Sequence, residues 1–140
     1  MIRKILICMF CTLSVFAGEG TLFITNRLNT PVVVCCCIVS ITGKELSSKV
    51  QVPKRTSHYS GGPVYWPSIQ DLFPRETLRG LVFHIKTEVY DSHGHLLNRG
   101  QTTHIFHRNP NSYDVQEIYA DLNIEITEGH SIYTHVGKSS

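Results

Sequence analysis

The sequence predicts an all-β fold: a single-domain β-sandwich of about seven or eight mostly antiparallel strands, preceded by a cleavable signal peptide. Three observations support this prediction. Residues 31–41, PVVVCCCIVSI, are apolar at both parities and rich in β-branched side chains. Short segments of strand length recur between turn residues. Beyond residue 18, no segment longer than about ten residues repeats its apolar positions with a helical period.

The first 18 residues have the pattern of an export signal. Arg3 and Lys4 precede an apolar run over residues 5–16, and Val15 and Ala17 suit a peptidase that cleaves near Gly18. The run is shorter than the roughly 20 residues that a membrane-spanning helix needs. An uncleaved anchor or a buried helix is the alternative. We therefore expect a secreted or periplasmic protein with its domain over residues 19–140 and no membrane span after cleavage.

Charge and composition narrow the function classes. The chain has 13 Lys and Arg against 11 Asp and Glu, and loss of Arg3 and Lys4 makes the two counts equal. A neutral domain lacks the basic footprint of a nucleic-acid binder, so no nucleic-acid partner is expected. Both methionines, Met1 and Met9, lie within the predicted signal. This argues against a thioether-based copper carrier.

The domain is predicted to open with a short strand over residues 21–26, followed by a polar turn. Pro31 then begins the central strand, at a position where its missing N–H does little harm. Because that strand offers apolar residues to both sides, we expect one face to be buried and the other at least partly covered. The turn around Gly43 leads into a further strand over residues 48–52.

Residues 54–80 are predicted to form a long irregular connection, with one helical turn over residues 68–73. This segment concentrates aromatic side chains that often dominate binding energy: Tyr59, Tyr65 and Trp66, preceded by Arg55. We expect these four residues to bind a protein or glycan ligand. The alternative is that Tyr65 and Trp66 fold back as a lid over an open end of the sandwich.

Two hairpins complete the predicted domain. In the first, the turn over residues 91–94 pairs Asp91 with His95 and Val89 with Leu97. This register places one set of side chains on an apolar face, namely Leu81, Phe83, Ile85, Val89, Leu97 and Ile105. It places a second set on a polar face, namely His84, Lys86, Glu88, Asn98, Thr102 and His104.

In the second hairpin, the turn over residues 126–129 places Ile124 opposite Ile132 and Asp121 opposite His135. Its predicted inner face consists of Leu122, Ile124, Ile126 and Ile132. Its predicted outer face consists of Asp121, Asn123, Glu125, Tyr133 and His135.

The chain holds eight histidines, and the predicted register puts His84 and His104 on one polar face with Glu88. Two such imidazoles could supply half of a divalent-metal site, because a metal needs three or four converging ligands. The alternative is that both are ordinary polar residues of a solvated strand.

Cys35, Cys36 and Cys37 are the cysteines that follow the predicted signal. Cys35 and Cys37 share one face of the strand and Cys36 points to the other. Three cysteines cannot all pair within one chain, and neighbours on a strand fit disulfide geometry badly. They are buried inert thiols, an intermolecular disulfide of a homodimer, or a thiolate metal site or vicinal redox pair. The outer face of this strand needs a cover, either residues 54–80 or a second copy of the protein.

We expect a non-catalytic binding or interaction module. The sequence has no Gly-x-Ser-x-Gly motif and no Gly-rich phosphate loop, and its thiols lie in an apolar run, which disfavours a reactive thiolate. A histidine-based divalent-metal-binding protein is the first alternative, and a small exported hydrolase the second. No cofactor is expected apart from the metal of the first alternative.

Overall fold

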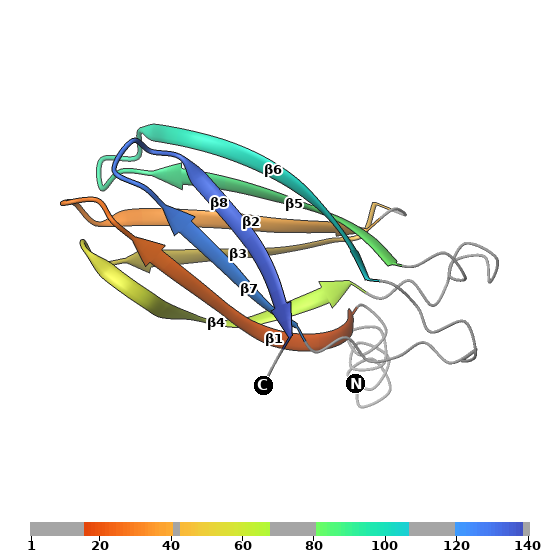
Figure 1. The fold of residues 1–140 in the computed structure, drawn as a ribbon. Coiled ribbons are helices and arrows are strands. Elements are labelled where there is room, and N and C mark those ends of the chain that lie inside the picture. Colours follow the sequence, from red (N-terminus) through yellow and green to blue (C-terminus); the bar gives the residue numbers. More distant parts are fainter. Residues whose placement is uncertain (1–15, 41–42, 68–80, 107–119, 139–140) are drawn as a thin grey trace, which may run out of the picture.

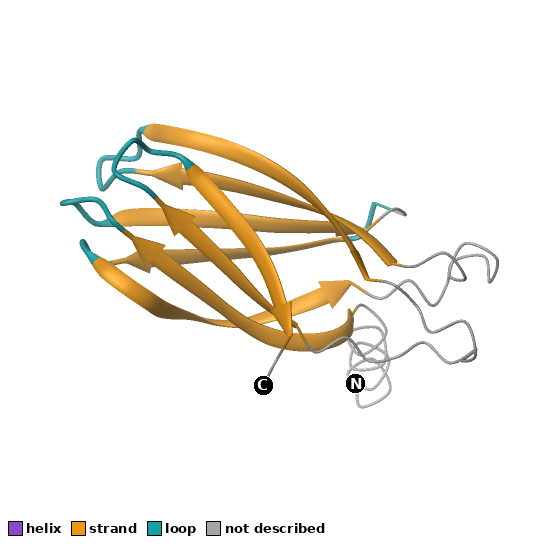
Figure 2. Ribbon diagram, in the orientation of Figure 1, coloured by secondary structure: helices purple, strands orange, loops and turns teal. Residues whose placement is uncertain are grey.

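The computed structural model describes residues 16–40, 43–67, 81–106 and 120–138. Two four-stranded sheets face each other in two layers (Figure 1). Every regular element in these ranges is a strand (Figure 2). The predicted all-β class and the two-sheet, mostly antiparallel architecture are confirmed.

The first sheet has the strand order β4-β1-β7-β8. Its strands are β1 (Phe16–Asn26), β4 (Thr56–Pro67), β7 (Ala120–Ile126) and β8 (Ile132–Lys138). β1 runs parallel to β7 and antiparallel to β4, and β7 pairs antiparallel with β8. The parallel pair brings the first strand of the domain beside its next-to-last strand.

The second sheet has the order β3-β2-β5-β6 and is antiparallel throughout. Its strands are β2 (Val32–Ser40), β3 (Glu45–Val52), β5 (Leu81–Tyr90) and β6 (Leu96–Phe106). β2 pairs with β3 on one side and with β5 on the other. The apolar run is therefore a central strand, as the sequence predicts.

The core lies between the two sheets, because alternate residues of each strand turn inward. On β2 the inward residues are Val32, Val34, Cys36, Ile38 and Ser40, and the residues between them are half-buried. The largest fully buried side chains include Trp66, Phe83, Leu22, Ile24, Ile38, Ile85, Leu122 and Ile124.

The prediction of an irregular connection over residues 54–80 is wrong for the part that forms β4. Gly61, Gly62 and Pro63 resemble loop residues in sequence, yet they lie within a strand at the sheet edge. The register of β1 against β4 shifts between Thr21 and Phe23, and Gly62 has a φ of 93°. Proline is tolerated on an edge strand because its missing N–H faces away from the ladder. The predicted helical turn over residues 68–73 lies outside the described residues.

The β5–β6 hairpin has the predicted turn but a different register. The N–H of Asp91 donates to the carbonyl of His95 at 2.9 Å, and Gly94 has a φ of 83°. Tyr90 pairs with Leu96, but Val89 pairs with Asn98, so Leu97 is an extra residue in a β-bulge. The predicted pairing of Val89 with Leu97 is wrong, and so is the face of every predicted β6 residue beyond it.

The β7–β8 hairpin has the predicted faces but different partners. Ile126, not Ile124, lies opposite Ile132, and Asn123 lies opposite His135. His130, with a φ of 65°, occupies the left-handed position that we predicted for Gly129. A slip of two residues preserves which side chains face inward, so the predicted inner residues Leu122, Ile124 and Ile126 are buried.

β1 begins at Phe16, earlier than the predicted residue 21 and within the last residues of the predicted signal segment. Residues 1–15 lie outside the described residues. Within the described ranges, no helix has the length and apolar character that crossing a membrane requires.

Candidate functional site

The β1–β2, β3–β4, β5–β6 and β7–β8 turns all lie at one end of the sandwich (Figure 1). We call this end the turn end. Three of these turns and the adjoining strand ends surround a polar cleft of about 180 Å³, which is large enough for a group of several heavy atoms. The cleft is lined by Thr25, Asn26, Arg27, Arg55, Thr56, Ser57 and Glu128.

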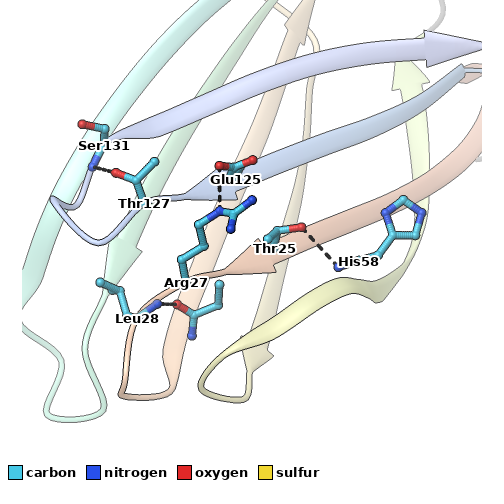
Figure 3. Close-up of polar contacts among 8 residues, drawn as sticks. Thr25, Arg27, Leu28, His58, Glu125, Thr127 and Ser131 are labelled. Carbon is cyan, nitrogen blue, oxygen red and sulfur yellow. Dashed lines mark hydrogen bonds and ion pairs between the residues drawn. The ribbon is translucent and has the colours of Figure 1, made fainter.

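Asn26 is the buried member of the cleft lining, with 1% of its surface exposed. Its Nδ2 donates to the carbonyls of Thr30 and Pro53, both at 3.0 Å. Its Oδ1 accepts from the N–H of Leu28 at 3.0 Å, a bond drawn in Figure 3. One side chain thus fixes the β1–β2 turn against the β3–β4 turn. A buried polar group with this many partners makes its surroundings rigid.

Arg27 follows β1 and reaches toward β7, as Figure 3 shows. Its Nε donates to Oε1 of Glu125 at 2.9 Å, and its backbone N–H donates to the carbonyl of Ile126 at 3.0 Å. The Arg27 side chain is 57% exposed. Glu125 binds the Arg27 guanidinium through Nε alone. The two terminal amino groups of Arg27 have no partner among the described residues.

Arg55 projects from the β3–β4 turn. Its backbone N–H donates to the carbonyl of Leu28 at 3.0 Å, and its Nε donates to Oδ1 of Asn29. Its φ of 46° lies in the left-handed region, where a side chain is disfavoured and glycine is the usual choice. A strained residue at a cleft is a reason to look for function there.

The walls of the cleft are fixed by bonds from neighbouring strands. His58 donates its backbone N–H to Thr25 Oγ1 at 3.2 Å (Figure 3), and its ring stacks on Phe23 with centroids 4.2 Å apart. In the β7–β8 turn, Thr127 Oγ1 accepts from the N–H of Ser131 at 3.1 Å. These contacts hold β4 against β1 and tighten the turn that carries Glu128.

The predicted aromatic binding residues do not form one surface. Trp66 is fully buried, donates its Nε1 to the carbonyl of Ala120 at 3.1 Å and packs against Phe83. Tyr59 is half-buried and also packs against the core. Tyr65 has the outward parity of β4, because the residues on either side of it in the strand face inward. Of the four predicted binding residues, Arg55 is the one that lines the cleft.

The predicted pair of histidines does not converge. The β6 bulge places His104 opposite Phe83, on the inward parity of the sheet, whereas His84 lies opposite Thr103 on the outward parity. His84 Nδ1 forms a hydrogen bond with Thr103 Oγ1 at 2.9 Å. Within the described ranges, no group of three or more His, Cys, Asp or Glu side chains is placed to hold a metal ion.

The three cysteines of β2 are free thiols with two different environments. Cys36 points into the core, where burial, and then the neighbouring Cys37, raises its pKa to about 12. Cys35 and Cys37 are half-buried on the outward face of β2. Cys37 Sγ lies 3.8 Å from Oε2 of Glu45.

Of the residues that line the cleft, Arg55 is predicted from the sequence, whereas Arg27, Asn26 and Glu128 are not. The available signal was the polar run of residues 26–30 between two apolar strands. The parallel β1–β7 pairing that brings this run beside Glu125 is a long-range contact. Comparisons with protein-family models, with curated proteins and with solved structures found no match for this chain.

Proposed function

We propose that this chain is a small exported, non-catalytic binding module that recognises a carboxylate of an acidic partner protein in the cleft at the turn end. The observation that carries the proposal is that Arg27 and Arg55 lie on adjacent turns and both line the polar cleft. The export part of the proposal rests on the pattern of the first 18 residues.

The two guanidinium groups suit this ligand. Arginine binds carboxylates through a planar fork of N–H donors, and charge-assisted bonds of this kind are stronger than neutral ones. Arg27 already binds one carboxylate, that of Glu125. Because Asn26 and the turn hydrogen bonds fix the backbone around both arginines, little ordering of that backbone would be needed on binding.

Glu128 opposes an acidic ligand at the same cleft. It is exposed on the β7–β8 turn and lines the cleft together with the two arginines. Its carboxylate repels an incoming carboxylate, so we expect the parent protein to bind acidic ligands weakly. The hydroxyls of Thr25, Thr56 and Ser57 add neutral donors and acceptors to the lining.

The lining also supports a non-catalytic role. The seven residues that line the cleft include neither histidine nor cysteine, and the ring of the neighbouring His58 stacks on Phe23. Activation of a hydroxyl nucleophile ordinarily requires an adjacent base such as histidine. The arrangement is therefore one of donors positioned for binding.

The proposal is tested by titrating the purified protein with an amidated hexaglutamate peptide and measuring affinity calorimetrically. Arg27→Gln and Arg55→Gln should each weaken binding about fivefold to tenfold, roughly 1 to 1.4 kcal/mol. Glu128→Gln should strengthen it, because the repelling charge is removed. Arg99→Gln, an exposed arginine on β6, is the matched control and should leave affinity unchanged.

Equal binding of a hexaglutamine peptide would contradict recognition of a carboxylate. Equal binding by the two arginine variants and the parent would contradict the assignment of the site. A sulfated glycan that binds in place of the peptide, with the same dependence on both arginines, would retain the site and change the partner class.

A further inference from the structure

The two outward faces of the sandwich differ in chemistry. On β2, at the centre of its sheet, the outward residues are Val33, Cys35, Cys37 and Val39, all half-buried. On β7, an interior strand of the other sheet, the outward residues are Asp121, Asn123 and Glu125. We call the outward surface of the β3-β2-β5-β6 sheet the β2 face.

The edge of the β2 face formed by β6 is also apolar at its two ends. Within the described ranges, three large hydrophobic residues are exposed, and two of them, Leu96 at 40% and Ile105 at 43%, lie on the outward parity of β6. Contiguous exposed apolar surface that is bordered by polar residues marks contact sites, and here the two residues extend the apolar strip of β2 toward the sheet edge. None of the strands in the described ranges covers the β2 face. Residues 54–80 are one of the two covers that the sequence predicts, and the part of them that forms β4 lies in the other sheet.

Charged and polar side chains flank the apolar centre in a pattern that can match itself. The register places Lys49 of β3 and Glu88 of β5 on either side of Cys35. It places Glu45 of β3 and His84 of β5 on either side of Val39. Within the described ranges, no carboxylate pairs with the exposed ammonium group of Lys49.

We propose that this protein forms a homodimer through the β2 face, with a two-fold axis that runs along β2. Such an axis exchanges the β3 side of one copy with the β5 side of the other. Lys49 then faces Glu88 of the second copy, Glu45 faces His84, and Val33, Cys35, Cys37 and Val39 pack on their own counterparts. A two-fold axis across the strands would instead place Lys49 opposite Ser47 and Glu45 opposite Gln51, both neutral, and Glu88 opposite Lys86. Lys49 contacts a carboxylate only with the axis along β2, so its charge reversal separates the two arrangements.

The size of the face fits a dimer of moderate affinity. Four strands about 4.8 Å apart, with about eight residues of about 3.3 Å each, give roughly 500 Å² per copy. The total of roughly 1,000 Å² is near the lower limit for a specific interface. We therefore expect a dissociation constant in the micromolar range, so that association depends on protein concentration.

This dimer does not need a disulfide. Facing sheets pack about 10 Å apart, whereas a disulfide requires Cα atoms within about 7 Å. Cys35 and Cys37 therefore remain thiols that the interface shields from solvent. Cys36 is buried within each copy and stays unreactive in monomer and dimer alike.

The test measures molar mass by sedimentation equilibrium over about a hundredfold range of concentration, under reducing conditions. Lys49→Glu and Glu88→Lys should each weaken association at least tenfold, because each creates two like-charge contacts across the axis. The Lys49→Glu/Glu88→Lys double variant should restore association. Lys54→Glu, at an exposed position in the β3–β4 turn, is the matched control and should associate like the parent.

Thiol labelling gives a second readout in the same samples. Labelling of Cys35 and Cys37 should slow as concentration rises, and Lys49→Glu should remove this dependence. A monomer at all concentrations would overturn the proposal. A dimer that is insensitive to the two charge reversals, or that the double variant fails to restore, would overturn the assigned face and axis.

Discussion

At the scale of single residues, the turn end uses backbone conformations that sequence patterns assign to glycine. Arg55 and His130 both have positive φ in turns at this end, and Gly94 has the same sign of φ in a third turn. Holding a side chain in the left-handed region disfavours the folded state by about 1 kcal/mol or more. In the proposed site the guanidinium group of Arg55 serves binding, whereas its backbone conformation disfavours the folded state.

A glycine replacement separates these two roles. Arg55→Gly relieves the backbone but removes the guanidinium and its bond to Asn29. We expect the free energy of unfolding to stay within about 1 kcal/mol of the parent, while affinity for hexaglutamate falls. Chemical denaturation and calorimetry measure the two quantities. His130→Gly, which relieves the same conformation outside the cleft lining, should leave affinity unchanged; equal loss of affinity in both variants would contradict the role of Arg55.

Trp66 shows how residue type alone can mislead. In the sequence, Tyr65 and Trp66 beside prolines resemble an exposed binding segment. In the structure, Trp66 is fully buried because the inward parity of β4 directs its indole between the sheets, where its N–H meets the carbonyl of Ala120. Local composition does not determine parity, because the register shifts in β4 depend on its pairing with β1.

At the scale of elements, Gly20 allows β1 and β7 to approach just before their parallel pairing, which begins at Leu22 and Leu122. A Cβ atom added at Gly20 would lie 1.6 Å from the carbonyl oxygen of Ala120, a backbone atom. Gly20→Ala should therefore lower the free energy of unfolding by at least about 2 kcal/mol, because the strands must separate locally.

Gly100→Ala is the matched control within a strand. An added Cβ there would meet Ile132 at 3.7 Å, which is an ordinary van der Waals distance. Urea denaturation followed by circular dichroism compares the two variants with the parent. If Gly20→Ala were no more destabilising than Gly100→Ala, the close approach of β1 and β7 would be contradicted.

Turn residues and apolar runs in the sequence predicted most of the strands. The largest error is the predicted faces of β6, and the β-bulge at Leu97 explains it. The turn at Asp91 and the central strand β2 follow from local residues. The extra residue at Leu97 has no local signature, and the half-buried Leu97 packs against the core. One added residue exchanges the two faces of β6. His104 therefore lies on the opposite face of the sheet from His84, and the two do not form the predicted metal pair.

At the scale of the whole molecule, the two proposals combine in one geometry. A two-fold axis parallel to β2 leaves the direction along the strands unchanged, so both turn ends of the dimer point the same way. A partner with two acidic segments could then occupy both clefts, and linked binding of this kind raises the overall affinity without new contacts.

The location of the cleft could be predicted only in part. Arg55 lies in a polar segment that sequence analysis selects, but Arg27 becomes part of the site because parallel pairing of β1 with β7 brings Glu125 beside it. Such a pairing joins residues about a hundred positions apart and follows from the assembly of the whole core.

The most direct test of the central claim is a map of amide chemical-shift changes in the full chain as hexaglutamate is added. Binding at the turn end predicts that the largest changes fall at residues 25–28, 54–57 and 127–129, with none at Val33, Cys35, Cys37 or Val39. Changes centred on the β2 face or around Tyr65, with residues 25–28 and 54–57 unaffected, would contradict the account.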